Sequence, residues 1–105
     1  MDEKKRRRLE EGGWTVGTVQ DFLGLSDEEA AYVEMRLSLS RTLREQRTAG
    51  GLTQTELARR IGSSQSRVAK MEAADATVSL DLLVRTLLAA GATRRDIAAA
   101  IAQTN

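Results

Sequence analysis

The chain has 105 residues, of which 41% are hydrophobic, and a formal net charge of +1, so it can form one domain with a single core. It contains no cysteine and no histidine. Disulfide bonds and thiolate metal sites are therefore excluded, and the usual general base and the usual zinc ligand are missing. We expect neither an enzyme nor a metal or cofactor site. No apolar run has membrane-spanning length and no signal-peptide pattern is visible, which predicts a cytoplasmic protein.

Positive charge is concentrated in the middle of the chain. The segment from Arg36 to Glu72 holds eight cations and three anions, a local charge of +5, so the remainder of the chain is net negative. A basic segment of this kind suits contact with phosphate groups. Only three aromatic residues are present, which disfavours proteins that stack RNA or single-stranded bases on aromatic rings.

The sequence before the basic segment has two parts. Residues 1–13 are a charge run closed by a pair of glycines, which we interpret as a flexible tail; a basic arm that touches DNA or a partner is the alternative. Residues 14–35 form an N-terminal extension with a short helix predicted near Thr18–Leu23 and ended by Gly24. Its apolar side chains are too numerous for a free tail and should dock on another surface: Trp14, Val16, Val19, Phe22, Leu23 and Leu25.

Cap signals predict a series of helices, and no strand signal is present. A capping box at Ser26 and Glu29 opens a long helix from Asp27 to about Ala49, whose apolar residues spread too widely for one neighbour. Shorter helices are predicted over 54–61 and 65–73. Two more begin at Ser79 and Thr93. The second has Ile97 and Ile101 facing inward, and the first has apolar residues at three-and-four spacing: Leu80, Leu83, Val84, Leu87 and Leu88. The fold class is all-α.

The stretch from Gln54 to Ala73 has the pattern of a helix-turn-helix. Small Ala58 lies at the fifth position, where two helices approach closely, and Gly62 lies at the ninth, where a left-handed backbone is needed. Apolar residues occupy the four inward positions: Leu57, Ile61, Val68 and Met71. The alternative is a helical hairpin used only for packing.

Residues Leu43 to Glu72 resemble the XRE family of phage-repressor-like DNA-binding domains. The resemblance rests on LTQTELARRIG, on SSQSRVAKME and on Arg47, seven residues before Gln54. It implies a five-helix repressor-like domain over 36–105, preceded by the helical extension. The segments FLGLSDEEAAYVEMRL and SLDLLVRTLLAAGA are similar, less specifically, to HigA-type antitoxins. The family often has Gly or Asn two residues after Glu72; Ala74 stands there, which predicts a different turn.

The resemblance also implies roles for individual residues. Gln65, Ser66 and Lys70 fall where bases are read, and their chemistry agrees, because Gln can bond adenine and Lys can reach guanine. Three residues are assigned to phosphate contacts: Gln54, Ser64 and Arg67. Arg47 and Glu72 are expected to form a structural ion pair. The alternative for the three base-contacting residues is a solvated polar face of a surface helix. A catalytic pair of Ser66 and Lys70 is disfavoured, because no oxyanion-binding feature supports it.

These predictions lead to a sequence-specific repressor that binds double-stranded DNA, associated with the nucleoid and without a membrane partner. One recognition helix reads few base pairs, so we expect a homodimer on an inverted repeat. The dimer surface could be the last helix (Ile97, Ala98, Ile101) or the extension from Trp14 to Leu37. The extension could instead bind a small ribonuclease-like toxin, which would make the chain an autoregulating antitoxin. A stand-alone repressor and a protein-interaction module without DNA binding are the alternatives.

Overall fold

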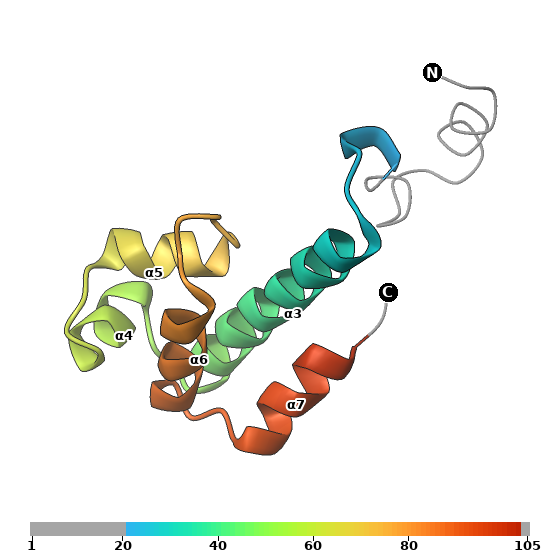
Figure 1. The fold of residues 1–105 in the computed structure, drawn as a ribbon. Helices are drawn as coiled ribbons and strands as arrows, with labels where there is room; N and C mark the ends of the chain where they lie inside the picture. Colours follow the sequence, from blue (N-terminus) through green and yellow to red (C-terminus); the bar gives the residue numbers. More distant parts are fainter. Residues whose placement is uncertain (1–20, 104–105) are drawn as a thin grey trace. The chain divides into compact units, whose positions relative to one another are not determined.

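The computed structural model describes residues 21–103, which contain helices and no strand (Figure 1). The five main helices are α3 (Asp27–Ala49), α4 (Gln54–Arg60), α5 (Gln65–Glu72), α6 (Leu80–Ala89) and α7 (Arg94–Ala102). The predicted all-α fold class is thereby confirmed. The tail 1–13 and the side chains of Trp14, Val16 and Val19 lie outside the described residues. No helix within 21–103 combines the length and the apolar character needed to cross a membrane.

The chain divides into two units, residues 1–34 with 104–105 and residues 35–103. In the described part of the first unit, residues 21–23 are helical and Gly24 follows with a φ of 71°. Ser26 then begins α3 with the predicted capping box. The backbone N–H of Glu29 donates to the Ser26 hydroxyl at 3.1 Å, and the backbone N–H of Ser26 donates to the Glu29 carboxylate at 3.2 Å.

In the second unit, α3 is covered on several sides. Ser38, Leu39 and Ser40 are consecutive and all are at most 2% exposed. Because successive helical residues point roughly 100° apart, such a run requires neighbours around much of the helix. This burial agrees with the prediction that more than one neighbour packs on α3. The hydroxyls of Ser38 and Ser40 have no hydrogen-bond partner among the described residues, and Leu37 remains 41% exposed.

One hydrophobic core joins the five helices of the second unit. Helices α4 and α5 pack against each other, and α6 packs on α7. The core combines apolar residues from every helix and from the loops before and after α6: Leu39, Leu43, Leu57, Ala58, Val68, Met71, Val78, Leu83, Leu87, Ala90, Ala92, Ile97 and Ala100. Ile61 packs against its edge. The inward positions predicted for the helix-turn-helix are thus filled as expected.

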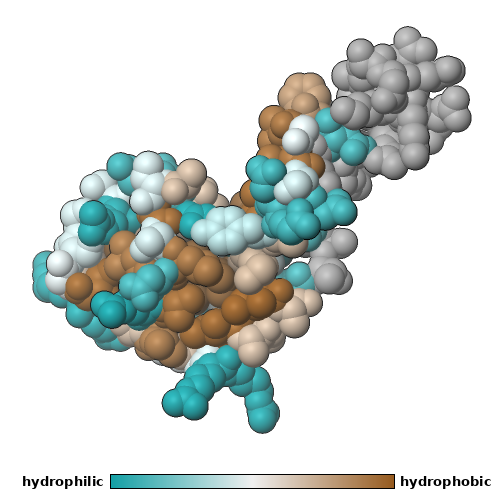
Figure 2. Space-filling view, in the orientation of Figure 1, coloured by the Kyte–Doolittle hydropathy of each residue, from teal (hydrophilic) through white to brown (hydrophobic). Residues whose placement is uncertain are grey.

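Ile101, which was predicted to face inward, and Leu88, from the apolar repeat of α6, are both exposed. Leu88 is 50% exposed and Ile101 is 40% exposed, and apolar surface is visible over α6 and α7 in Figure 2. The inner face of α6 uses Thr86 instead, which is 1% exposed. Its hydroxyl donates to the Leu82 carbonyl at 2.8 Å, so the polar group is satisfied within the helix. A threonine that bonds its own helix can enter a core, and the hydrophobic pattern alone does not reveal this.

The ends of α4 and α5 have the same backbone geometry. After α4, Gly62 adopts a φ of 67° and the N–H of Ser63 donates to the Ala58 carbonyl at 2.8 Å. After α5, Ala74 adopts a φ of 56° and the N–H of Asp75 donates to the Lys70 carbonyl at 3.0 Å. The prediction of a different turn at Ala74 is therefore wrong. Alanine takes the left-handed conformation that Gly or Asn takes more easily, at a cost of about 1–2 kcal/mol.

Candidate nucleic-acid interface

Two helix caps place the glutamines of the helix-turn-helix. Thr53 begins α4, where its hydroxyl accepts from the backbone N–H of Glu56 at 3.1 Å and its own N–H donates to the Glu56 carboxylate at 3.0 Å. Ser64 begins α5, where its hydroxyl accepts from the N–H of Arg67 at 3.2 Å. Gln54 and Gln65 are consequently the first residues of their helices, and the packing of α4 on α5 brings them together.

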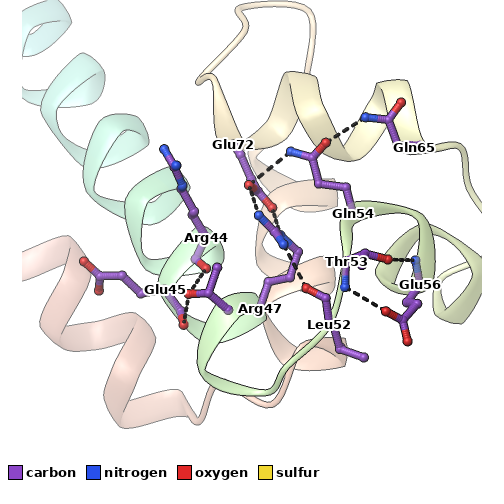
Figure 3. A network of polar contacts seen from close by, with 10 residues as sticks. Arg44, Glu45, Arg47, Leu52, Thr53, Gln54, Glu56, Gln65 and Glu72 are labelled. Atoms are coloured by element: carbon purple, nitrogen blue, oxygen red, sulfur yellow. Dashed lines mark hydrogen bonds and ion pairs between the residues drawn. The ribbon is translucent and has the colours of Figure 1, made fainter.

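An ion pair between α3 and the end of α5 supports this arrangement (Figure 3). Nε of Arg47 lies 2.5 Å from Oε2 of Glu72, and Nη2 lies 3.0 Å from Oε1. The third guanidinium nitrogen, Nη1, donates to the Leu52 carbonyl at 2.8 Å. The two side chains are only 13% and 6% exposed, and the hydrogen bond to Glu72 raises the pKa of Arg47 above its ordinary value. The expected pairing of Arg47 with Glu72 is thus present in the structure and partly buried.

The ion pair continues into a chain of amide hydrogen bonds. Oε1 of Glu72 also accepts from Nε2 of Gln54 at 3.3 Å, and Oε1 of Gln54 accepts from Nε2 of Gln65 at 2.7 Å. Figure 3 shows the succession from Arg47 on α3 to Glu72 at the end of α5, then to Gln54 on α4 and Gln65 at the start of α5. Sequence reasoning assigned the pair and the two glutamines separately, because residue spacing does not show that Glu72 and Gln54 touch.

A polar depression lies on another side of α5. Its volume is about 350 Å³, and four of the predicted contact residues line it: Ser64, Ser66, Arg67 and Lys70. Thr77, Val78 and Leu82, from the segment after α5 and from α6, complete the lining. The hydroxyls of Ser64 and Ser66 lie 3.3 Å apart. Gln65 is not part of this depression, so the six predicted DNA-contacting residues fall into two groups.

The loop between α5 and α6 borders the depression and is held in shape by its own polar groups. The carboxylate of Asp75 accepts from the hydroxyl of Thr77 at 2.5 Å and from its backbone N–H at 2.8 Å. These hydrogen bonds lower the pKa of Asp75 below its ordinary value of 3.8. From α3, Nη2 of Arg36 donates to the Asp75 carbonyl at 2.7 Å. The sequence predicted a loop at Asp75 and Thr77, and their D-x-T spacing is the signal for the turn. No sequence signal predicted that Arg36 contacts this loop.

The side chains at this interface suit nucleic acid better than a metal ion. Within residues 21–103 no cluster of three or more acidic side chains could hold a metal. The exposed groups are amides, hydroxyls and cations, which can bond base edges and phosphate oxygens. A short helix with such a face, packed across a turn on a preceding helix, defines a helix-turn-helix DNA-binding unit.

A comparison with known families agrees. A model described as helix-turn-helix matches residues 43–97, slightly more than half of the chain. The chain belongs to the XRE-type helix-turn-helix family, a family of DNA-binding transcriptional regulators rather than of enzymes. No curated protein sequence and no solved structure matches it.

Proposed function

We propose that the protein is a sequence-specific repressor that binds double-stranded DNA through α5. The observation that carries this proposal is the fixed position of Gln65, an exposed amide held by Gln54 at the start of α5. Cations stand beside it on the same short helix, since Arg67 and Lys70 line the neighbouring depression. A polar side chain in a fixed position can recognise a base, and exposed cations beside it can contact phosphate groups. A DNA-binding protein needs both for sequence-specific binding.

Each group of side chains has a chemical task in this proposal. Gln65 bonds an adenine edge in the major groove, while Ser66 and Lys70 contact further base edges. Arg67 and Ser64 bond phosphate oxygens, and so does Gln54, whose amide keeps one N–H after its bond to Glu72. DNA as the ligand also places the protein with the nucleoid.

We further propose a homodimer on an inverted repeat, with half-sites about one helical turn, roughly 34 Å, apart. The exposed side chains of Leu88 and Ile101 favour a contact through α6 or α7. Ile97 is only 9% exposed and belongs to the core, so it is unavailable for such a contact in the folded chain. Sedimentation at micromolar concentration should give the mass of a dimer, and a monomer would overturn this part of the proposal.

The N-terminal extension, residues 14–35, favours the more specific role of an autoregulating antitoxin. Phe22, Leu23 and Tyr32 are 57%, 60% and 44% exposed, which is much apolar surface for the start of a short chain. In this version that surface binds a small ribonuclease-like toxin. In the alternative version, a stand-alone repressor uses the same surface for its own dimer.

A gel-shift titration tests the function directly. The protein is titrated onto its own upstream DNA and onto scrambled DNA, with and without the product of the neighbouring gene. Preference for the upstream DNA is expected, and the neighbouring product should shift the complex further if it is a toxin partner. Equal binding to both DNAs would contradict the repressor, and failure of the two proteins to copurify would contradict the antitoxin.

A protein-interaction module that keeps the fold without DNA binding is the second candidate, favoured by the same exposed apolar residues. The two candidates differ in salt dependence. A DNA-binding protein loses affinity steeply between about 50 and 200 mM salt, because each phosphate contact releases counterions. Weak binding to DNA that salt does not change would favour the interaction module.

A further inference from the structure

We propose that Glu72 is a positioning residue for base specificity, which acts through Gln54 to set which atoms of Gln65 face the DNA. This inference rests on the proposed function, in which α5 enters the major groove and Gln65 meets a base. It adds a second task to the Arg47–Glu72 pair. The pair joins α3 to α5, and it also fixes the orientation of an amide two residues further along a hydrogen-bond chain.

The first step follows from the chemistry of a carboxylate. Glu72 accepts two hydrogen bonds from the guanidinium of Arg47, so it is ionised and has no proton to donate. The group of Gln54 that faces it, with Nε2 3.3 Å from Oε1 of Glu72, must therefore be the NH₂ group. The opposite orientation would place an amide oxygen against a carboxylate oxygen in a site where Glu72 is 6% exposed.

The second step passes this orientation to α5. Once the NH₂ group of Gln54 faces Glu72, its oxygen faces away from Glu72 and towards Gln65. An oxygen requires a donor, and Nε2 of Gln65 lies 2.7 Å from it. Gln65 is therefore also fixed in one orientation, with one N–H committed to Gln54. Its remaining groups are one N–H and the free oxygen Oε1.

The third step compares these remaining groups with the bases. In the major groove adenine presents the N7 acceptor and the N6 donor, which match one N–H and one oxygen. Guanine presents two acceptors, N7 and O6, and would need two donors from the same amide. Gln65 has only one N–H left, and its oxygen would face the O6 oxygen of guanine. The network therefore favours adenine over guanine at the base that Gln65 contacts.

Binding-site selection from a randomised duplex library tests this inference, with folding checked by circular dichroism. The wild-type protein is expected to select adenine at one position of each half-site, and Gln65→Ala identifies that position by losing the preference there. In Glu72→Gln, one carboxylate oxygen becomes an NH₂ group and no longer fixes Gln54. The ratio of affinities for adenine and guanine at that position should fall roughly five-fold to hundred-fold, while other positions keep their preferences.

Two further variants make the result decisive. Gln54→Met breaks the hydrogen-bond chain and leaves the ion pair intact, so it should lower the same ratio, and it replaces Glu72→Gln if that variant does not fold. Glu45→Gln removes an equal charge from an exposed position on α3 and should change nothing. An unchanged ratio in the folded Glu72→Gln or Gln54→Met variant would overturn the inference, as would an even loss of preference at all positions. A wild-type protein that selects no sequence would instead overturn the proposed function.

Discussion

The two sides of α5 differ in how much the protein restrains them. On the side that faces α4, Gln65 is bonded to Gln54, which is bonded to Glu72, which is bonded to Arg47 on α3. On the side of the depression, Arg67 and Lys70 form no side-chain hydrogen bond or ion pair with any residue in the range 21–103. A restrained amide loses little freedom when it meets a base, whereas Arg67, the cation assigned to phosphate, can follow a phosphate backbone of any sequence. One helix can thus separate specificity from general affinity.

The largest expected effect is a loss of stability when the ion pair behind the restrained side of α5 is broken. Arg47→Met leaves the carboxylate of Glu72 nearly buried without its cation, so the free energy of unfolding should fall by about 3–5 kcal/mol. Thermal or urea denaturation measures this change. Arg85→Met is the matched control, because it breaks an ion pair to Asp81 whose side chains are 77% and 76% exposed, and it should cost no more than about 0.5 kcal/mol. Similar costs for the two variants would contradict the restrained role of Arg47.

A contrast between Gln65 and Arg67 tests the two sides against each other. Gln65→Ala should reduce discrimination at one base pair by about 1–3 kcal/mol and leave the dependence on salt unchanged. Arg67→Gln should weaken binding to all sequences alike and lower the slope of log affinity against log salt by about 1. Affinities measured on specific and scrambled DNA over a range of salt concentrations separate the effects. If both variants change specificity alike, the two sides of α5 do not divide the work as proposed.

The turn at Ala74 should give a smaller effect of opposite sign. Ala74→Gly relieves the left-handed strain of about 1–2 kcal/mol but adds freedom to the unfolded chain, so a net gain of about 0.5–1 kcal/mol is expected. Gly62→Ala is the converse substitution and should lower the free energy of unfolding by about 1 kcal/mol. A Cβ at this position meets no atom within 4 Å, so only the backbone conformation opposes it. Thermal melting of both variants checks the pair. A loss of stability in Ala74→Gly would show that the turn is held by something other than its φ angle.

The smallest expected effect concerns pH and the loop that borders the depression. Hydrogen bonds from Thr77 lower the pKa of Asp75 in the folded state, so Asp75 stabilises the fold above its ordinary pKa of 3.8. This contribution is lost as the pH falls through the folded-state pKa. Asp75→Asn should therefore remove part of the decline in stability between neutral pH and about pH 3. Denaturation curves at several pH values check the difference, and parallel pH profiles of the two proteins would contradict it.

Much of the fold could be predicted from the sequence because its signals are local. Ser26, Thr53 and Thr93 each precede an acidic residue at the spacing of a capping box, and each begins a helix in the structure. The period of Leu57, Val68 and Met71 likewise marked the core. Ala74 was misjudged for the converse reason. The backbone at that position is imposed by the packing of α5 and the following loop, and it overrides the weak preference of alanine.

The site was predicted residue by residue but not as an arrangement. The motif named Gln54, Gln65 and Glu72 without showing that they form one hydrogen-bond chain, since their contact depends on how α3, α4 and α5 pack. Leu88 and Ile101 illustrate the same limit for the core. Both fit the helical period, but the inner face of each helix turns towards Thr86 and Ala100 instead. Periodicity shows which residues share an apolar face, whereas packing against the other helices determines which of them are buried.

The attachment of α5 and of the loop after it to α3 also bears on when the recognition helix becomes ordered. Arg47 holds Glu72, and Arg36 holds the Asp75 carbonyl from eleven residues earlier on α3, on the order of 16 Å away along the helix. A helix of eight residues is not stable by itself, so its order depends on these attachments and on the core. Its hydrogen-bonded amide protons should therefore be protected from exchange with solvent. DNA therefore meets a helix that is already rigid, and association should proceed without a folding step.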